Sequence, residues 1–279
     1  SGLNNQGMTC YLNSLIQTLF MTPEFRLNIL NWKYQENLHG EKADCIPYQI
    51  KKLFAKLQLK NRKSEETKSL TKSFQWGNSE AFYQHDIQEL CRVLFEAIEM
   101  SINFDENFKP EKNFINQIFE GFSSSIVKCK ECDYESIRKD KFLDISLPIR
   151  NEFEKIYNNS LEIALKNYTR IETLENDNKY FCEKCDKKVD ALKFIKFEEM
   201  PSVILFQLNR FEYNYMTDSR VKIHDKVTFP LVLDMNLFMS PNLNSENDKD
   251  KENNCKKDLF NTTLNEEFFK VRSEAKINL

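Results

Sequence analysis

Three stretches in the N-terminal part of the chain place apolar side chains at helical spacing. In Leu12–Phe20 the apolar residues recur at i, i+3 and i+4, which predicts one buried helical face. Thr22-Pro23 ends this pattern, because proline disfavours helix at the residue before it. Ile46–Leu57 and the longer Ser79–Met100 repeat the pattern, the latter with an unbroken apolar stripe. We therefore expect a helical N-terminal region, with a charged loop over residues 60–69.

Beyond residue 114 the pattern changes to one typical of strands. Alternating or strand-like apolar runs occur in Gly121–Lys128, Phe142–Ile149, Lys193–Phe197 and Val227–Phe229. Val203–Leu208 is apolar on both faces, which predicts a central strand of a sheet. Ser160 is a candidate N-cap for a helix over residues 161–168. A helical region followed by a strand-rich one predicts an α+β fold.

The last forty residues differ in composition from the rest. The chain turns polar from about Ser240, and Asn244–Lys257 is nearly free of apolar residues. Such a segment cannot bury enough apolar surface to order itself, so we expect a polar insertion or a disordered tail. Glu266–Val271 is a candidate for a marginal helix within it.

Cys10 stands at the junction between a polar turn and the first predicted helix. Unpaired backbone N–H groups and the positive end of the helix dipole lie at such a position, and they favour the thiolate, which is the nucleophilic form. Asn5 lies five residues upstream, where its amide could reach an oxyanion formed at Cys10. The alternative is a cysteine that packs as a small hydrophobic residue at the start of a helix.

Two Cys-x-x-Cys pairs, Cys129/Cys132 and Cys182/Cys185, predict a metal site. Two thiolate pairs in tight turns, brought together at strand ends, form a four-sulfur tetrahedral zinc site. Four protein ligands leave no open coordination position, so the zinc would be structural. The alternative is two unrelated reduced turns; a redox pair is disfavoured, because neither pair opens a helix in a βαβ unit.

Charge and cysteine usage limit the classes of partner. The 279 residues carry 40 basic and 43 acidic side chains, a net charge of −3, and the pI is about 5.8. This balance offers no general attraction to nucleic acid or to an acidic membrane. No apolar run approaches the roughly 20 residues needed to span a bilayer. The eight cysteines show no disulfide framework, which favours a reducing compartment, the cytoplasm or the nucleus.

Residues 2–17 read Gly-Leu-Asn-Asn-Gln-Gly-Met-Thr-Cys-Tyr-Leu-Asn-Ser-Leu-Ile-Gln and closely resemble the cysteine box of the ubiquitin-specific proteases. The resemblance implies a papain-like cysteine protease fold with a helical thumb, a palm and zinc-bearing fingers that cup ubiquitin. It also implies a deubiquitinating activity, the thiol-dependent hydrolysis of isopeptide and peptide bonds at the ubiquitin C-terminus. Cys10 would be the nucleophile and Asn5 the oxyanion-hole amide, with ubiquitin and ubiquitinated proteins as partners.

The resemblance also divides the chain. It places the thumb with the nucleophile helix in residues 1–112, and the fingers with part of the palm in residues 113–200. Palm strands and a loop over the cleft would occupy residues 201–239, followed by the polar insertion or tail in residues 240–279. The match ends near residue 238, so the palm would be incomplete.

Two further motifs correspond to family segments beside the ubiquitin tail. Gln84-His85-Asp86-Ile87-Gln88-Glu89 matches one, and the resemblance assigns Gln84, Asp86 and Glu89 to the tail-binding cleft. The alternative for Asp86 and Glu89 is a helix N-cap and a solvated first-turn acid. Asn209-Arg210-Phe211 follows the predicted palm strand and matches a second tail-contacting segment.

A catalytic histidine is the missing part of this resemblance. A cysteine protease needs a base to take the thiol proton, and the family's histidine box ends in a Gly-Gly-His-Tyr-like sequence that is not found here. His39 lies in a predicted charged loop, His85 in the tail-cleft motif, and His224 where relatives carry a non-catalytic polar residue. Loss of the base should lower the rate by on the order of 10²–10⁴.

The first residues lie inside a motif without an initiator methionine, so we expect a piece excised from a longer protein whose base follows residue 279. The fragment itself would be inactive or weakly active. The main alternative is a non-catalytic scaffold that binds ubiquitin. A zinc-ribbon nucleic-acid module is disfavoured by the acidic pI.

Overall fold

A computed structural model describes residues 1–7, 9–60, 62–74, 87–103, 113–151, 156–214 and 218–239. The chain divides into a unit of residues Ser1–Ser240 and a separate segment, Pro241–Leu279. The predicted polar insertion and its marginal helix lie outside the described residues. Within them, no helix is long and apolar enough to cross a membrane.

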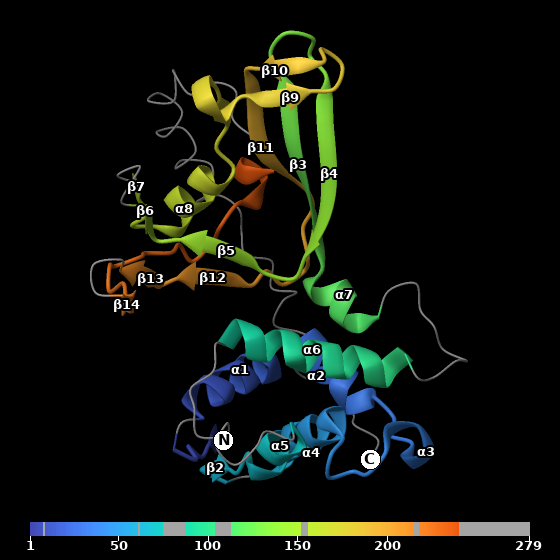
Figure 1. Ribbon diagram of the computed structural model, residues 1–279. Coiled ribbons are helices and arrows are strands. Elements are labelled where there is room, and N and C mark those ends of the chain that lie inside the picture. The colour runs from blue at the N-terminus through green and yellow to red at the C-terminus, as the bar shows by residue number, and fades with distance from the viewer. Residues whose placement is uncertain are drawn as a thin grey trace, which may run out of the picture. The chain divides into compact units, whose positions relative to one another are not determined.

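The first part of the described chain is helical, as Figure 1 shows. Its helices are α1 (Cys10–Met21), α2 (Pro23–Asn31), α3 (Glu36–His39), α4 (Ile46–Leu59), α5 (Lys68–Ser73), α6 (Ile87–Asn103) and α7 (Phe114–Phe119). Two short strands, β1 (Gly2–Leu3) and β2 (Ser64–Glu65), pair in parallel. Proline occupies the first turn of both α2 and α4, where its missing N–H would be unsatisfied in any residue.

Buried faces of these helices form a first hydrophobic core. Phe25 is completely buried and its ring contacts those of Phe54, Phe95, Phe114 and Phe119. Aromatic pairs at these separations add to the stabilisation from burial. The apolar stripes of α1, α4 and α6 therefore converge on one interior.

Strands dominate the next part of the chain. They are β3 (Gly121–Cys129), β4 (Glu135–Phe142), β8 (Glu172–Leu174), β9 (Tyr180–Cys182), β10 (Lys187–Val189) and β11 (Ala191–Glu199), with a 3₁₀ helix η2 (Asn176–Asn178) between β8 and β9. Four of these strands form an antiparallel sheet in the order β4-β3-β11-β8. β9 and β10 form a hairpin of their own. Figure 1 shows this hairpin across the ends of β3 and β11.

A second group of elements surrounds a second core. It comprises β5 (Ile145–Pro148), β6 (Arg150–Asn151), β7 (Ile156–Tyr157), α8 (Leu161–Tyr168), β12 (Phe206–Asn209), β13 (Phe211–Asn214), β14 (Ser219–Lys222) and the 3₁₀ helix η3 (Met235–Phe238). β5 pairs in parallel with β12, while β6–β7 and β13–β14 are antiparallel pairs. Ser160 caps α8 by accepting a hydrogen bond from the Ile163 N–H, as expected from the sequence.

Two short segments, residues 142–145 and 203–206, run between the two cores. Leu143, Val203 and Leu205 pack against the first core, whereas Phe142, Ile145, Ile204 and Phe206 pack against the second. Backbone hydrogen bonds join the segments to their neighbours, from Ile145 N to Leu205 O at 2.8 Å and from Val203 N to Ile118 O at 2.9 Å. Each segment thus sends side chains into both cores.

This arrangement corrects the prediction of a central strand over Val203–Leu208. Among the described residues the strand begins only at Phe206 and pairs with β5 alone. Both faces of residues 203–206 are apolar because each face meets a different core. The prediction that residues 203–208 form a strand with a neighbour on either side is therefore wrong for the described part of the chain.

Some of the other predicted helices, loops and strands are confirmed and some are wrong. The helices predicted from Leu12 and from Ile46 are confirmed as α1 and α4, and residues 87–100 of the third lie in α6. The predicted loop over residues 60–69 instead contains β2 and the start of α5. The run Phe142–Ile149 is not one strand, because β4 ends at Phe142 and β5 starts at Ile145. Val227–Phe229 contributes a single bridge, from Thr228 to Ser160.

Candidate functional site

The backbone before α1 is held by the short β1–β2 pair. Gly2 N–H donates to Lys63 O at 2.9 Å, and Asn4 N–H donates to Glu65 O at 2.9 Å. Gly7 has a φ of +108°, a conformation that side chains with a Cβ rarely adopt. The glycine therefore lets the chain turn from β1 into the start of α1.

Polar side chains then fix the turn itself. Thr9 is buried; its hydroxyl accepts from the Gln6 N–H at 3.0 Å and donates to Asn5 Oδ1 at 3.2 Å. The Gln6 amide donates in turn to the hydroxyl of Thr67, next to α5. Because Asn5 uses its carbonyl oxygen on Thr9, its exposed side chain keeps the NH₂ group as a donor for another acceptor.

Cys10 is the first residue of α1, and its side chain is exposed. No side chain caps this helix start, and its first turn carries no acidic residue. The following residues, Tyr11 and Leu12, are buried in the first core. Cys10 is thus accessible at the positive end of a helix that has no side-chain cap. It does not pack as a small hydrophobic residue.

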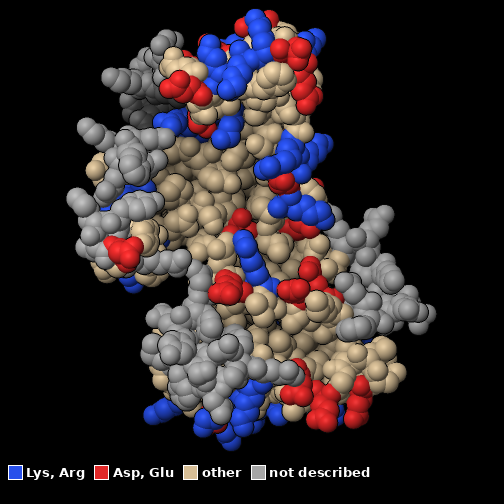
Figure 2. Space-filling model, in the orientation of Figure 1, with Lys and Arg blue, Asp and Glu red and all other residues tan. Residues whose placement is uncertain are grey.

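The first turn of α6 carries Glu89, which is exposed. Gln84 and Asp86 lie outside the described residues. Figure 2 shows acidic side chains gathered over α6 on the face in view. Cys91 lies on the opposite, buried face, as expected for a core residue, and burial raises the pKa of its thiol to about 12.

Asn209, Arg210 and Phe211 connect β12 to the β13–β14 hairpin. Asn209 and Phe211 are exposed, with Phe211 at 63%. The guanidinium of Arg210 donates from Nη1 to Ile223 O at 3.2 Å and to Asp225 O at 3.0 Å, and Ile223 N–H donates to Arg210 O at 2.6 Å. Arg210 therefore closes the base of its own hairpin, a role the sequence did not indicate.

Two histidines lie within the described residues. His39 ends α3 instead of lying in a loop; its Nδ1 accepts from the Gln35 N–H and its Nε2 donates to Ser101 O, both at 2.9 Å. A ring with both nitrogens engaged in this way is a structural histidine. His224 is exposed, as expected. His85 lies outside the described residues.

The four cysteines of the two Cys-x-x-Cys pairs come together at one end of the four-stranded sheet. Their sulfur atoms all lie within 4.8 Å of one another. Cys129 and Cys185 sulfurs are 3.9 Å apart, and those of Cys132 and Cys182 are 3.7 Å apart. A tetrahedral ion about 2.3 Å from each sulfur would require separations of about 3.8 Å. The donor set and its spacing therefore fit a zinc ion.

Both cysteine turns share one backbone feature. Asp133 and Asp186, each directly after the second cysteine of its pair, have φ values of 55° and 52°. Aspartate and asparagine tolerate this left-handed conformation better than other residues with a side chain. Cys-x-x-Cys-Asp occurs twice in the sequence, so this feature could have been read in advance as a sign of two matching turns.

Electrostatics at the cluster also favour a cation. Burial alone would raise the pKa of the Cys129 thiol, but hydrogen bonds from the backbone N–H groups of Cys132 and Glu131 and from neighbouring thiols lower it to about 7. Hydrogen bonding with Cys132 and burial raise the pKa of Cys185 to about 12. These opposite shifts arise because the thiols lie close together, an arrangement in which a bound cation would stabilise their ionised forms.

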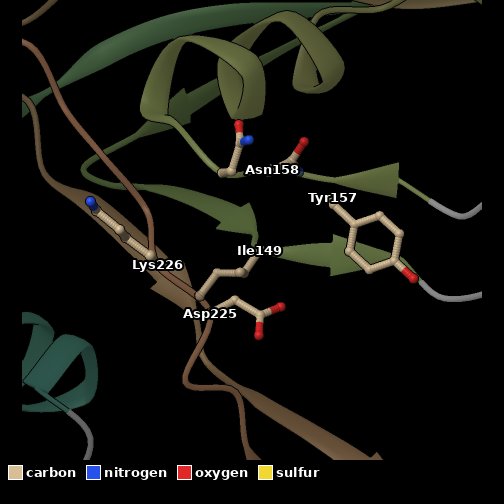
Figure 3. Close-up of a pocket in the computed structure, with 6 residues that line it drawn as sticks. Ile149, Tyr157, Asn158, Asp225 and Lys226 are labelled. Atoms are coloured by element: carbon tan, nitrogen blue, oxygen red, sulfur yellow. The ribbon is translucent and has the colours of Figure 1, made fainter.

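A cavity of about 320 Å³ lies elsewhere on the second group of elements. Figure 3 shows Ile149 next to Asp225, with the ring of Tyr157 opposite and Lys226 pointing away from that ring. Arg150 Nη1 lies 3.8 Å from Asp225 Oδ2. None of the residues predicted to be catalytic or metal-binding lines this cavity.

Comparison with known sequences decides the family. The family profile described as "Ubiquitin carboxyl-terminal hydrolase" matches residues 1–260, nearly the whole chain. The chain belongs to the ubiquitin carboxyl-terminal hydrolase family.

Individual family members agree with this assignment. Ubiquitin carboxyl-terminal hydrolase 47 of Drosophila melanogaster is 46% identical over 246 residues, which are 88% of this chain and 15% of the relative. The human protein of the same name is 43% identical over 258 residues, 90% of this chain and 18% of the relative. Ubiquitin C-terminal hydrolase 13 of Arabidopsis thaliana is 39% identical over 252 residues, which are 90% of this chain and 21% of the relative. The chain thus spans about a fifth or less of these relatives.

A solved structure confirms the fold expected for this family. It is entitled "Structure of the SAGA Ubp8/Sgf11/Sus1/Sgf73 DUB module bound to ubiquitin aldehyde" and superposes with a TM-score of 0.72 at 27% identity. The match covers 86% of this chain and 53% of that one. The papain-like α+β fold of the ubiquitin-specific proteases is therefore confirmed.

In this family member the structure brings some predicted site residues together and places others on different elements. Asn5 and Cys10 share one turn, and the four cysteines form one cluster. Glu89 lies on α6, while the Asn209–Phe211 segment follows β12. A hydrogen-bond network around Asp144, which lies between α6 and β5, was not predicted from the sequence.

Thiol chemistry offers a direct check on this placement of the family's cysteines. We expect iodoacetamide at pH 8 to modify Cys10 at least about tenfold faster than Cys91, because the buried Cys91 thiol stays protonated and only thiolates react. Peptide mass spectrometry of the alkylated, folded protein measures both rates. Equal rates at the two positions would contradict the assigned environments, and urea-unfolded protein provides the control in which both react.

Proposed function

We propose that the protein from which this chain comes is a deubiquitinating cysteine protease, and that Cys10 is its nucleophile. The observation that carries the proposal is the exposed thiol at the uncapped start of α1, in a chain that matches its family over residues 1–260. The substrates would be isopeptide and peptide bonds at the C-terminus of ubiquitin.

In the proposed reaction the thiolate of Cys10 attacks the carbonyl carbon of the terminal glycine of ubiquitin. The NH₂ group of Asn5 and the backbone N–H groups at the start of α1 stabilise the oxyanion that forms. The amine leaves with a proton returned by the base, and a thioester joins Cys10 to ubiquitin. Water then hydrolyses the thioester, which releases the ubiquitin carboxylate and restores the thiol.

The general base of this reaction is proposed to lie outside the described residues. Support comes from His39, whose two ring nitrogens are both hydrogen-bonded, and from the absence of the family's histidine box in the sequence. Glu89, Asn209 and Phe211 are exposed. Together with Arg210 they are the proposed contacts of the ubiquitin tail among the described residues. Gln84 and Asp86 are proposed on the resemblance alone.

Zinc is the proposed metal of the four-cysteine cluster, held by Cys129, Cys132, Cys182 and Cys185. Four thiolates complete its tetrahedral shell, so the ion would fix the ends of β3, β9 and β10 and take no part in the reaction. The sulfur spacing supports this assignment.

The proposed partners are ubiquitin and ubiquitinated proteins. The structural relative was solved bound to ubiquitin aldehyde, a derivative of the same protein. With a pI near 5.8, we propose neither a nucleic acid nor a membrane as a partner. A reducing compartment, the cytoplasm or the nucleus, is proposed because none of the seven described cysteines forms a disulfide.

A ubiquitin-binding scaffold without catalysis is the second candidate. It is favoured by one observation, that neither described histidine forms a hydrogen bond with Cys10. Ubiquitin carrying a fluorophore on its C-terminus separates the two candidates in the full-length protein. We expect release of the fluorophore with saturation kinetics. Saturable binding of ubiquitin without release would establish the scaffold, and neither binding nor release would overturn both.

A further inference from the structure

Asp144 lies between β4 and β5, and α6 binds it from two positions. Its side chain is only 10% exposed. Gln88 Nε2 donates to Asp144 Oδ2, and Arg92 Nη2 donates to Asp144 Oδ1 at 3.1 Å. Gln88 and Arg92 are four residues apart, so they lie on the same face of the first half of α6. Both oxygens of one carboxylate are thus used to hold one helix.

The same network continues into the parallel strands. Gln88 Nε2 lies 3.5 Å from Ser146 Oγ, which donates to Gln207 Oε1 at 3.2 Å. Ser146 and Gln207 are partners in the register of β5 and β12. A chain of polar contacts therefore runs from Asp144 through Gln88 on α6 and Ser146 on β5 to Gln207 on β12.

This network lies next to the residues proposed to hold the ubiquitin tail. Gln88 immediately precedes Glu89 in the first turn of α6, and Gln207 lies two residues before Asn209. The two groups of proposed tail contacts come from sequence positions more than a hundred residues apart. Contacts between α6 and the β5–β12 pair therefore help to fix the separation of the two groups.

Apolar packing between α6 and the β5–β12 pair is less directional than this hydrogen-bond network. Leu143 and Leu205 contact the first core, but hydrophobic burial has little directional preference. Hydrogen bonds to an ionised carboxylate are short and directional, and they weaken sharply when the geometry is wrong. Asp144 also raises the pKa of both Cys91 on α6 and Tyr168 on α8, in each case after the larger effect of burial, so its charge faces both helices.

We infer that Asp144 is a positioning residue for ubiquitin binding, and this inference rests on the function proposed above. Asp144, with Gln88 and Ser146, holds the first turn of α6 in register with β5 and β12. Without these hydrogen bonds the chain also adopts arrangements in which the distance between Glu89 and the Asn209–Phe211 segment does not suit the ubiquitin tail. The apparent affinity for ubiquitin is then lowered in proportion to the fraction of molecules that can still bind it.

Asp144→Asn tests the inference in the full-length protein, because asparagine keeps the size of the side chain and removes its charge. With ubiquitin fluorophore as substrate we expect KM to rise about fivefold or more, while kcat changes by less than about twofold. Glu96→Gln, an exposed charge removal on the same helix, is the matched control and should leave both constants unchanged. Alkylation of Cys10 by iodoacetamide and the midpoint of thermal unfolding are recorded for each variant.

A double-mutant cycle with Arg92→Gln sharpens the test. Arg92 is 64% exposed on its side chain, so its loss should not impair folding. The two substitutions remove one ion pair, and the increase in KM of the double variant should therefore fall below the product of the single increases. Asp144→Glu, which restores the charge on a longer side chain, should recover part of the lost affinity.

The outcomes separate the inference from the function on which it rests. No hydrolysis by the wild-type protein overturns the proposed function. Hydrolysis by wild type with an unchanged KM in Asp144→Asn overturns the positioning role alone. A drop in kcat with KM unchanged, or independent effects in the cycle with Arg92→Gln, would also overturn it.

Discussion

Cys10→Ala should abolish the hydrolysis of ubiquitin fluorophore by the full-length protein, with a loss of about 10⁴-fold or more in kcat. The other parts of the site cannot replace the nucleophile, and removal of one such group typically removes most of the rate enhancement. The variant should still bind ubiquitin, because Cys10 is exposed and contributes little to the core. Steady-state kinetics and a ubiquitin-binding titration measure the two properties separately.

An electrophilic ubiquitin probe gives an independent measurement of the same prediction. Wild type should form a covalent adduct, and Cys10→Ala should form none. Cys91→Ala is the matched control, since Cys91 is buried and should leave adduct formation intact. An adduct on Cys10→Ala would show that another thiol is the nucleophile.

Cys182→Ser should remove the metal and destabilise the strand ends that meet at the cluster, those of β3, β9 and β10. Structural zinc sites contribute apparent binding free energies of about 10–16 kcal/mol in small domains, which is folding free energy where the site has little core of its own. The core beside the cluster consists of few residues besides the cysteines, among them Val189 and Tyr180. Elemental analysis should find one zinc per wild-type chain and well under one in the variant.

Limited proteolysis locates the consequence of that loss. We expect new cleavage between residues 129 and 190 in Cys182→Ser and in wild type treated with a chelator. Cys10→Ser, which changes a cysteine outside the cluster, should keep its zinc and its resistance. Full zinc content in Cys182→Ser would contradict the four-cysteine site.

Helical spacing in the sequence was sufficient where one face of an element meets one core. Leu12, Leu15, Ile16 and Leu19 are all buried on α1, and the face expected for α4 is likewise buried. The helices α2 and α5 were not predicted, because both are short. In α2 the apolar spacing is also interrupted by apolar residues that are exposed, such as Leu27. Periodicity cannot identify a helix of two turns whose burial depends on neighbours.

The same argument explains the error at Val203–Leu208. Apolar residues on both faces are typical of a strand inside a sheet, but they are equally required of a segment that runs between two cores. Sequence pattern reports that a side chain is buried and says nothing about which interior receives it. Only the fold distinguishes the two cases.

The candidate site divides in a similar way. Cys10 and Asn5 were singled out by their place before a predicted helix and by the family resemblance, and the four cysteines by their short spacing within each pair. Asp144 and Gln88 are 56 positions apart and have ordinary polar identities. Nothing in their local sequence marks a pair that is formed by the packing of α6 against β5. The hydrogen bonds from the Arg210 guanidinium to two backbone carbonyl oxygens were likewise not predicted, while its contact with ubiquitin stays a prediction.

The two segments that run between the cores have a consequence for unfolding. Because Leu143 and Ile145, or Leu205 and Phe206, belong to different interiors, neither interior can lose its packing without pulling on the backbone of the other. The helical and strand-rich parts are therefore thermodynamically coupled and should melt as one cooperative unit. A substitution that weakens the first hydrophobic core should then also lower the free energy of unfolding of the strand-rich part.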